Sequence, residues 1–317
     1  MRLGLCGVGG LIATGLREQL AELELGLSSL SVFSLAPIEE GASVRFEGRT
    51  VPVMALSDLE FSELDLLVLL EPHPEMAELA DNANALGCHV IDATMAPAGG
   101  RWVVPELMLD ERVDYPVYWA LPHAALSALA PVLEGLQAGN ELLSVDALIC
   151  ESASAYGDKG TRQLAAETAR LLNGQGIEGD GPQLAFNLLP DSLENAEVLE
   201  QGLQDLLGVR LSACRLDRAQ MPLFYGQATH LTATLAQPLM LDSCMAAWRE
   251  SGIHVFESKE GFSTVALAED DRIHLGGLQP GRSDDHTLRA WIIADNIRKG
   301  AVVNTTRLIE ILIKSSI

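Results

Sequence analysis

The chain has 317 residues, of which 48% are hydrophobic, so it holds more apolar side chains than one core usually buries and is predicted to form two domains. Its 21 lysines and arginines against 44 aspartates and glutamates give a net charge of −23, which would repel phosphates and excludes nucleic acid and anionic membranes as expected partners. The five cysteines have no zinc-binding spacing, and no secretory signal or membrane-spanning run is recognisable, so we expect reduced thiols, no metal site and a cytoplasmic location.

The first part of the chain alternates short apolar strands with helices. A strand, a glycine turn and a helix are predicted over 2–23, a helix over 76–87, and further strands over 27–36, 64–72, 88–94 and 115–122. The run 64–72 is almost continuously apolar, as in a strand that is buried on both faces. This alternation predicts a Rossmann-like, doubly wound α/β domain.

The pattern changes after about residue 125. Extended segments are predicted over 142–155 and 211–236, and helices over 159–174, 238–252 and 294–317. Long strands with flanking helices predict a second domain of the α+β class.

A glycine turn joins the first strand to the first helix. Gly7, Gly9 and Gly10 would let the backbone turn tightly and approach a pyrophosphate resting on the helix N-terminus, while Ala13 stands where a third glycine is usual. This context predicts a dinucleotide-binding loop. The alternative is a tight turn in a Rossmann-like domain that has lost its ligand.

Two acidic residues, Glu39 and Glu40, follow the second predicted strand, where such folds read the ribose. A carboxylate accepts hydrogen bonds from a ribose 2′-hydroxyl but repels a 2′-phosphate. If a dinucleotide binds at all, NAD is therefore expected to bind better than NADP. The alternative is a solvated acidic loop with no cofactor.

Five segments carry motifs that span nearly the whole chain. They read WVVPELM (102–108), ESASAYGDKGTRQL (151–164), LAFNLLP (184–190), MPLFYGQ (221–227) and ADNIRKGAVVNTTRLIEILI (294–313). Together and in this order they resemble the aspartate-semialdehyde dehydrogenase family. The resemblance implies a dinucleotide-binding domain of residues 1–123 plus 296–317, and an α+β domain of residues 124–295 that carries the interface of a homodimer.

The resemblance also implies a reaction and its residues. The family reduces an acyl phosphate to an aldehyde with NADPH, using a thiolate that forms a thioacyl enzyme, a histidine that handles protons, and arginines that hold the carboxylate and phosphate. His123, in ALPHAALSALAP, stands at the position of the nucleophilic cysteine, just before a predicted helix. Gln227 stands at the position of the proton-handling histidine, and Gln220 at that of the substrate-binding arginine.

Three further positions complete the comparison. Glu151 aligns with the glutamine near the nucleophile, and the phosphate-binding arginine falls at about Pro97. Arg218 lies two residues before Gln220. His230 lies three residues after Gln227, and because odd offsets along a strand face opposite sides, it is expected to point away from the site.

These departures remove the groups on which the parent reaction depends. Without a thiolate there is no thioacyl intermediate, and a glutamine amide cannot act as a general acid or base. An uncharged side chain cannot pair with a carboxylate or phosphate as arginine does. We expect a divergent homologue without the parent activity, which binds a nucleotide, metabolite or protein.

The alternative is an oxidoreductase of the aldehyde or oxo-donor class that uses NAD(P) with altered chemistry. His123 and Glu151 would then form an acid–base pair suited to hydrolysis or proton transfer. Otherwise His123 only fills a vacated pocket and is bonded to a neighbour.

Overall fold

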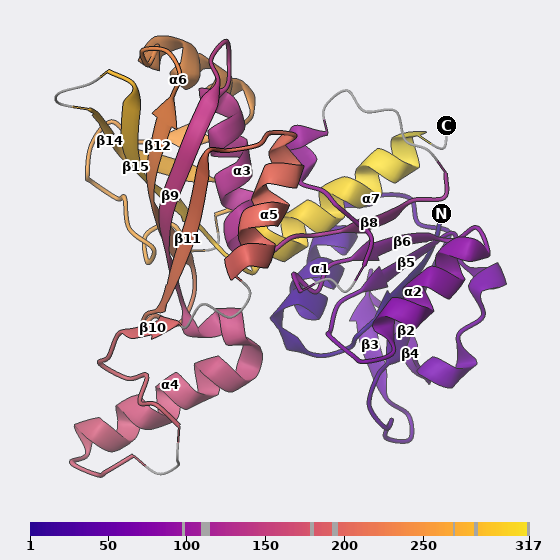
Figure 1. Ribbon diagram of the computed structural model, residues 1–317. Coiled ribbons are helices and arrows are strands. Elements are labelled where there is room, and N and C mark those ends of the chain that lie inside the picture. Colours follow the sequence, from indigo (N-terminus) through magenta and orange to yellow (C-terminus); the bar gives the residue numbers. More distant parts are fainter. Residues whose placement is uncertain are drawn as a thin grey trace. The chain divides into compact units, whose positions relative to one another are not determined.

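The computed structural model describes residues 1–96, 99–108, 115–177, 181–191, 196–268, 270–281 and 285–315. The chain divides into two units, Met1–His123 with Ala301–Ile317, and Ala124–Gly300 (Figure 1). The first is an α/β unit around a largely parallel sheet and the second an α+β unit around a mixed sheet, so the predicted fold class is confirmed. The chain returns to the first unit at Ala301 rather than at the predicted residue 296.

An eight-stranded sheet forms the first unit, in the order β3-β4-β2-β1-β5-β6-β8-β7. Its strands are β1 (Arg2–Cys6), β2 (Ser29–Ser34), β3 (Ser43–Phe46), β4 (Arg49–Ala55), β5 (Leu66–Leu69), β6 (His89–Asp92), β7 (Arg101–Trp102) and β8 (Tyr118–Ala120). All neighbours pair in parallel except β3 and β4, a hairpin that the sequence did not predict. The carboxyl ends of β1 and β5 lie side by side at the switch in strand order, the position where such sheets bind ligands.

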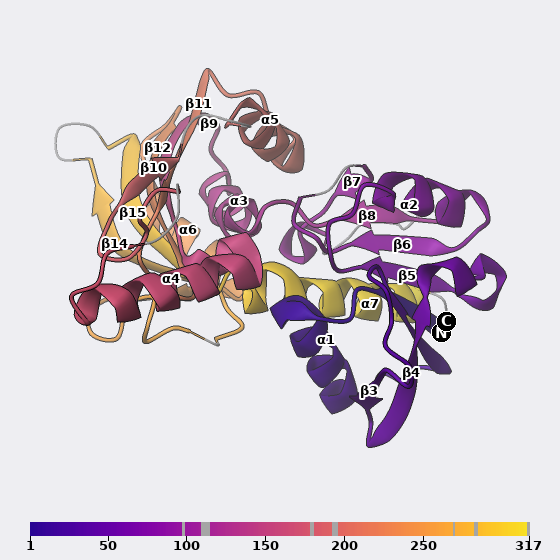
Figure 2. The ribbon, with the colours of Figure 1, turned by 90° about the horizontal axis from the view of Figure 1, so that it is seen from below.

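Helices cover both faces of this sheet (Figure 2). Helices α1 (Gly10–Leu23) and α7 (Asn304–Ser315) pack with Leu3 and Leu5 of β1 on one face, and α2 (Met76–Ala85) packs with Cys6 and Leu67 on the other. The faces alternate along each strand because successive side chains point to opposite sides.

A seven-stranded sheet forms the second unit, in the order β10-β11-β9-β12-β15-β14-β13. Its strands are β9 (Leu142–Glu151), β10 (Leu189–Asp191), β11 (Ala213–Gln220), β12 (Gln227–Leu235), β13 (His254–Val255), β14 (His274–Pro280) and β15 (Thr287–Ala294). The predicted extended segment 211–236 is two strands rather than one. Pro222 has no N–H for a ladder and Gly226 has a φ of +82°, so the chain turns between them.

Helices α3 (Ala124–Leu136), α5 (Ala196–Leu207) and α6 (Leu241–Glu250) accompany this sheet, and α4 (Gly157–Leu172) follows β9. Helix α3 is buried along almost its whole length, which explains its alanine-rich sequence. A side chain at Gly135 would lie 2.3 Å from the ring of Trp248, so α3 and α6 meet closely only because position 135 is glycine.

The predicted helix 294–317 begins later than expected. Strand β15 ends at Ala294, a π-helical turn covers Arg298–Val303, and α7 starts at Asn304. A side chain at Gly15 of α1 would lie 3.1 Å from Val302, so α1 also approaches this returning segment closely.

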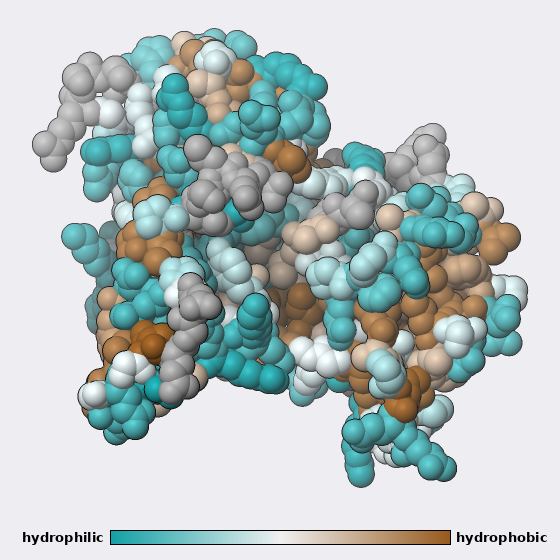
Figure 3. Space-filling view, turned by 60° about the horizontal axis from the view of Figure 1, so that its bottom comes forward, coloured by the Kyte–Doolittle hydropathy of each residue, from teal (hydrophilic) through white to brown (hydrophobic). Residues whose placement is uncertain are grey.

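No helix in the described ranges is both long and apolar enough to cross a membrane. Figure 3 shows the hydrophobic side chains on one face as separate patches among hydrophilic ones.

Candidate functional site

The predicted glycine turn is present between β1 and α1, and two of its glycines have backbone conformations that favour glycine. Gly7 and Gly10 have φ angles of +119° and +75°, which other residues rarely adopt, and Gly9 is the N-cap of α1. A side chain at Gly7 would lie 3.0 Å from Leu70 and Glu71, so the backbone here passes close to the end of β5. Ala13 is buried on the inner side of α1.

The structure adds one residue to this loop that the sequence did not single out. The Gly9 N–H donates a hydrogen bond to Oε1 of Glu71 over 3.1 Å. Glu71 follows Leu70, whose N–H bonds the Cys6 carbonyl at the end of β1. In the sequence, Glu71 is recognisable as a charged residue directly after an apolar run. Its contact with the glycine turn could be predicted only if β5 were known to lie next to β1.

Glu39 and Glu40 lie exposed in the loop after β2. Strand β2 is a direct neighbour of β1, so this loop starts at the same edge of the sheet as the glycine turn. Their proposed contact with a ribose remains a prediction.

Three of the predicted catalytic positions meet at one edge of the second sheet. Glu151, the last residue of β9, pairs with Gln220 on β11 and with Gln227 on β12. Residues paired across a sheet point to the same face, so these side chains form a row. Glu151 and Gln227 are 2% and 3% exposed.

Glu151 holds a tyrosine and an arginine beside this row. Its Oε2 accepts a hydrogen bond from the Tyr156 hydroxyl over 3.1 Å, and its Oε1 lies 3.9 Å from Nη1 of Arg218. Arg218 is two residues from Gln220 and therefore on the same face of β11. Its positive charge lies beside the negative Glu151 carboxylate, which partly neutralises it. Less positive charge is therefore left to attract the carboxylate of a substrate.

Gln227 connects this row to the start of α3. Its Nε2 donates a hydrogen bond over 3.0 Å to the carbonyl of Ala124, the residue after His123. His123 is half-buried, three residues beyond the end of β8, and is the last residue of the first unit. The predicted turn from strand to helix is therefore present, whereas a pairing of His123 with Glu151 stays a prediction.

Asn296 holds together the loops around the row. Its Oδ1 accepts hydrogen bonds from the Gly226 N–H and the Ser154 hydroxyl, both over 3.0 Å. Gly226 directly precedes Gln227, and Ser154 lies three residues after Glu151. One buried amide therefore holds the chain segments next to both of these site residues. The motif ADNIRKG supplies this residue, although its role was not predicted.

Two further expectations have simple outcomes. His230 pairs with Leu148 and with Trp291, on the face opposite Gln227, as the odd spacing predicts. Pro97, near which the phosphate-binding arginine of the family was predicted to fall, lies outside the described residues.

All five cysteines lie among the described residues, and none has the features of a reactive nucleophile. Burial raises the thiol pKa of every one of them, to about 12 for Cys6 and Cys214 and about 11 for Cys88. A reactive cysteine needs a lowered pKa so that the thiolate is populated near neutral pH.

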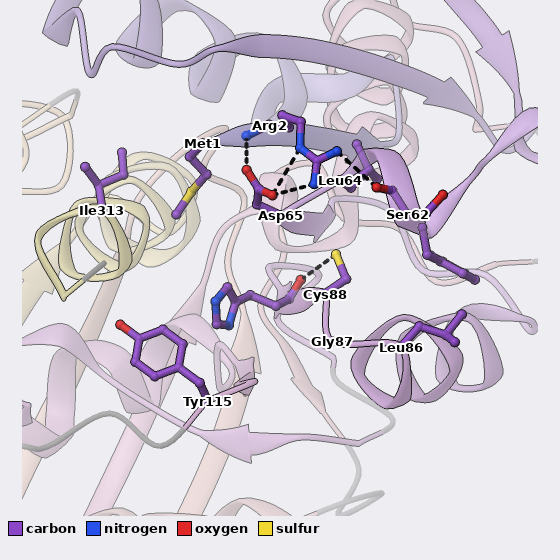
Figure 4. A pocket seen from close by; sticks show the side chains of 12 residues that line it. Met1, Arg2, Ser62, Leu64, Asp65, Leu86, Gly87, Cys88, Tyr115 and Ile313 are labelled. Carbon is purple, nitrogen blue, oxygen red and sulfur yellow. Dashed lines mark hydrogen bonds and ion pairs between the residues drawn. The ribbon is translucent and has the colours of Figure 1, made fainter. Parts of the chain in front are cut away.

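A cavity of about 670 Å³ lies in the first unit at the amino ends of β1 and β6, away from the glycine turn (Figure 4). Arg2 and Asp65 pair with each other on its wall, with Nη2 and Oδ1 2.7 Å apart. Arg2 also donates to the Ser62 carbonyl. The charges of Arg2 and Asp65 therefore neutralise one another, and Cys88, which also lines the cavity, is one of the thiols whose pKa is raised by burial.

Comparison with known proteins points in one direction. Residues 129–299 match the family described as the semialdehyde dehydrogenase dimerisation domain. The USG-1 protein homolog of Pseudomonas aeruginosa is 27% identical over 99% of this chain and 98% of its own length. The aspartate-semialdehyde dehydrogenase of Shewanella sp. strain DB6705 is 26% identical over 97% of this chain and 96% of its own.

A solved structure extends the similarity to three dimensions. The structure of a probable aspartate-semialdehyde dehydrogenase from Pseudomonas aeruginosa superposes with a TM-score of 0.90 at 26% identity. The match covers 100% of this chain and 99% of the other. Both units are therefore common to the two proteins.

Proposed function

Because the chain belongs to the semialdehyde dehydrogenase family, we propose that it keeps the family's two-unit architecture and does not carry out the reduction of an acyl phosphate to an aldehyde. The observation that carries this proposal is the bond between Gln227 and Ala124. An amide that cannot titrate is fixed where the family has its proton carrier, beside the residue that follows His123.

The nucleophile supports the same proposal from a second direction. A histidine stands at the cysteine position, and the raised pKa values of all five thiols argue against a substitute elsewhere in the chain. The parent reaction would lack both the group that forms the covalent intermediate and the group that moves its proton.

We assign the row of Gln220, Glu151 and Gln227 to the binding of a small polar metabolite. Two amides and a carboxylate supply donors and acceptors, and Arg218 supplies one positive charge. Thermal-shift measurements with small carboxylic acids and their amides test this role, because a ligand that binds the native state raises its melting temperature. The ligand should no longer stabilise a Glu151→Ala variant that is itself folded.

If a dinucleotide binds at the glycine turn at all, we propose that the acidic loop after β2 favours NAD over NADP. The negative charges of Glu39 and Glu40 would repel the 2′-phosphate of NADP, and the whole chain has a net charge of −23. Titration calorimetry with both dinucleotides tests the preference, and tighter binding of NADP than of NAD would contradict it.

We also propose a homodimer formed by the second unit. Leu148, His230 and Trp291 form a row across β9, β12 and β15, on the face opposite Gln227, and Leu148 and Trp291 are 41% and 39% exposed. The segment LAFNLLP adds Phe186 and Leu188, which are 66% and 51% exposed. Apolar side chains of this size are expected to be covered in an assembly of two copies.

The five free cysteines fit the reducing cytoplasm proposed from the sequence.

A further inference from the structure

The glycine turn of the first unit already holds an anion, and the anion is part of the chain. Gly9 caps α1, a helix of 14 residues, and in dinucleotide-binding folds the pyrophosphate rests on the free N–H groups at this end of the helix. The Gly9 N–H is bonded to the Glu71 carboxylate over 3.1 Å. We infer that Glu71 occupies the phosphate position of the loop and excludes the pyrophosphate of a dinucleotide.

Space supports the inference as well as the hydrogen bond. The missing side chain of Gly7 would lie 3.0 Å from Cγ and 3.2 Å from Oε1 of Glu71. In such a loop the first glycine serves the tight turn and the second, here Gly9, leaves room for phosphate to approach the backbone; a Cβ at Gly9 would lie 4.0 Å from Oε1 of Glu71. Here the side chain of Glu71 fills that room.

Charge supports it in a third way. A phosphate that approaches Gly9 would meet the negative carboxylate at contact distance, in a chain that is already strongly acidic. Arg17 reaches the turn from α1, but its Nη1 donates to the Val8 carbonyl over 3.0 Å and its Nη2 to the Thr14 hydroxyl. The Arg17 guanidinium therefore connects the loop to the helix. The Glu71 carboxylate would have to move away from Gly9 before a phosphate could bind there.

The residues of the turn thus do not fit NAD or NADP in the arrangement that the fold family implies. This conclusion concerns the cofactor loop alone and goes beyond the proposed loss of the parent reaction. A protein could fail to turn over aspartate semialdehyde with the loop either open or filled, so the two claims need different measurements.

Titration calorimetry of the full-length protein with NAD and with inorganic pyrophosphate tests the inference. Glu71→Ala removes both the charge and the bond, whereas Glu71→Gln removes the charge and leaves an oxygen able to accept from Gly9. We expect NAD to bind Glu71→Ala at least about tenfold more tightly than the wild type, with Glu71→Gln between them.

Glu75→Ala is the matched control, because Glu75 is exposed four residues later and its loss changes the net charge equally. It should bind NAD as the wild type does. Equal binding by the wild type and Glu71→Ala, including no detectable binding by either, would overturn the inference. An equal gain by Glu75→Ala would also overturn it, since net charge rather than position would then control binding.

Discussion

The side-chain amide of Gln227 donates a hydrogen bond to the main-chain carbonyl of Ala124, over 3.0 Å, in a site where Gln227 is 3% exposed. The bond ties the first residue of β12 to the first residue of α3. The bond gives the buried amide of Gln227 a partner and fixes its position, so we expect the side chain to contribute to the stability of the fold.

Replacing Gln227 with alanine should therefore lower the stability of the protein. The change removes a buried hydrogen bond and leaves a small cavity, at an expected cost of about 1–3 kcal/mol in the free energy of unfolding. Gln220→Ala is the control, since the same residue type lies on the other side of Glu151 and is less buried. Equal losses for the two variants in denaturant unfolding would argue against the structural role of Gln227.

A second prediction concerns the anchoring of LAFNLLP. Glu167 of α4 accepts hydrogen bonds from the N–H groups of Leu184 and Ala185, over 2.7 and 2.9 Å, and from Gln163. Burial opposes its ionisation, but the hydrogen bonds from Ala185, Gln163 and Leu184 outweigh burial and lower the pKa of Glu167 below its ordinary value of 4.5. The ionised carboxylate is therefore the form that stabilises the fold.

The sign of the pH dependence follows from that lowered pKa. The contribution of Glu167 is fully present above pH 4.5 and is lost as the pH falls through the lower pKa of the folded state. Glu167→Gln should cost about 1–3 kcal/mol at pH 7, and the difference from the wild type should shrink in acid. Asp158→Asn, in an exposed pair with Arg162 on the same helix, should cost less than about 1 kcal/mol. A difference that is constant between pH 7 and pH 3 would refute the assignment.

The homodimer is tested by sedimentation at micromolar concentration. The wild type should sediment as a dimer, and Trp291→Arg should shift it toward the monomer, because the added charge would be buried against the partner copy. Leu86→Arg is the control, since Leu86 is 72% exposed and belongs to the first unit. A wild type that is monomeric would contradict the prediction directly.

Restoring the family's residues one at a time should not restore the reaction. Groups that act as a unit in catalysis are strongly non-additive, so repairing one recovers little. His123→Cys supplies a thiol, but Gln227 still cannot move a proton and Gln220 still gives the substrate carboxylate no cation. We expect no turnover from His123→Cys and slight turnover from the triple variant that adds Gln227→His and Gln220→Arg. Turnover by His123→Cys alone would mean that the other two positions are wrongly assigned.

Local features of the sequence were sufficient for much of the first unit. A continuous apolar run predicted the buried strand that contains Leu66–Leu69, and glycines between a strand and a helix predicted the turn before α1. The row of Gln220, Glu151 and Gln227 was assembled only through the family resemblance, because the strand registers that align these residues are set by tertiary pairing.

The contact between Gly9 and Glu71 could not be predicted in this way. The two residues are 62 positions apart, and they meet only because β5 lies next to β1. The break at 221–226 and the π-helical turn before α7 were missed for a related reason. Each is an interruption in a segment whose apolar pattern continues on both sides of it.

The most direct test of the central claim is the phosphate-dependent reduction of NAD and NADP by the purified wild-type protein with aspartate semialdehyde as substrate. A protein with histidine at position 123 and glutamine at position 227 should give no enzyme-dependent absorbance change with either cofactor. Sustained turnover by the wild type, abolished by His123→Ala, would contradict the account.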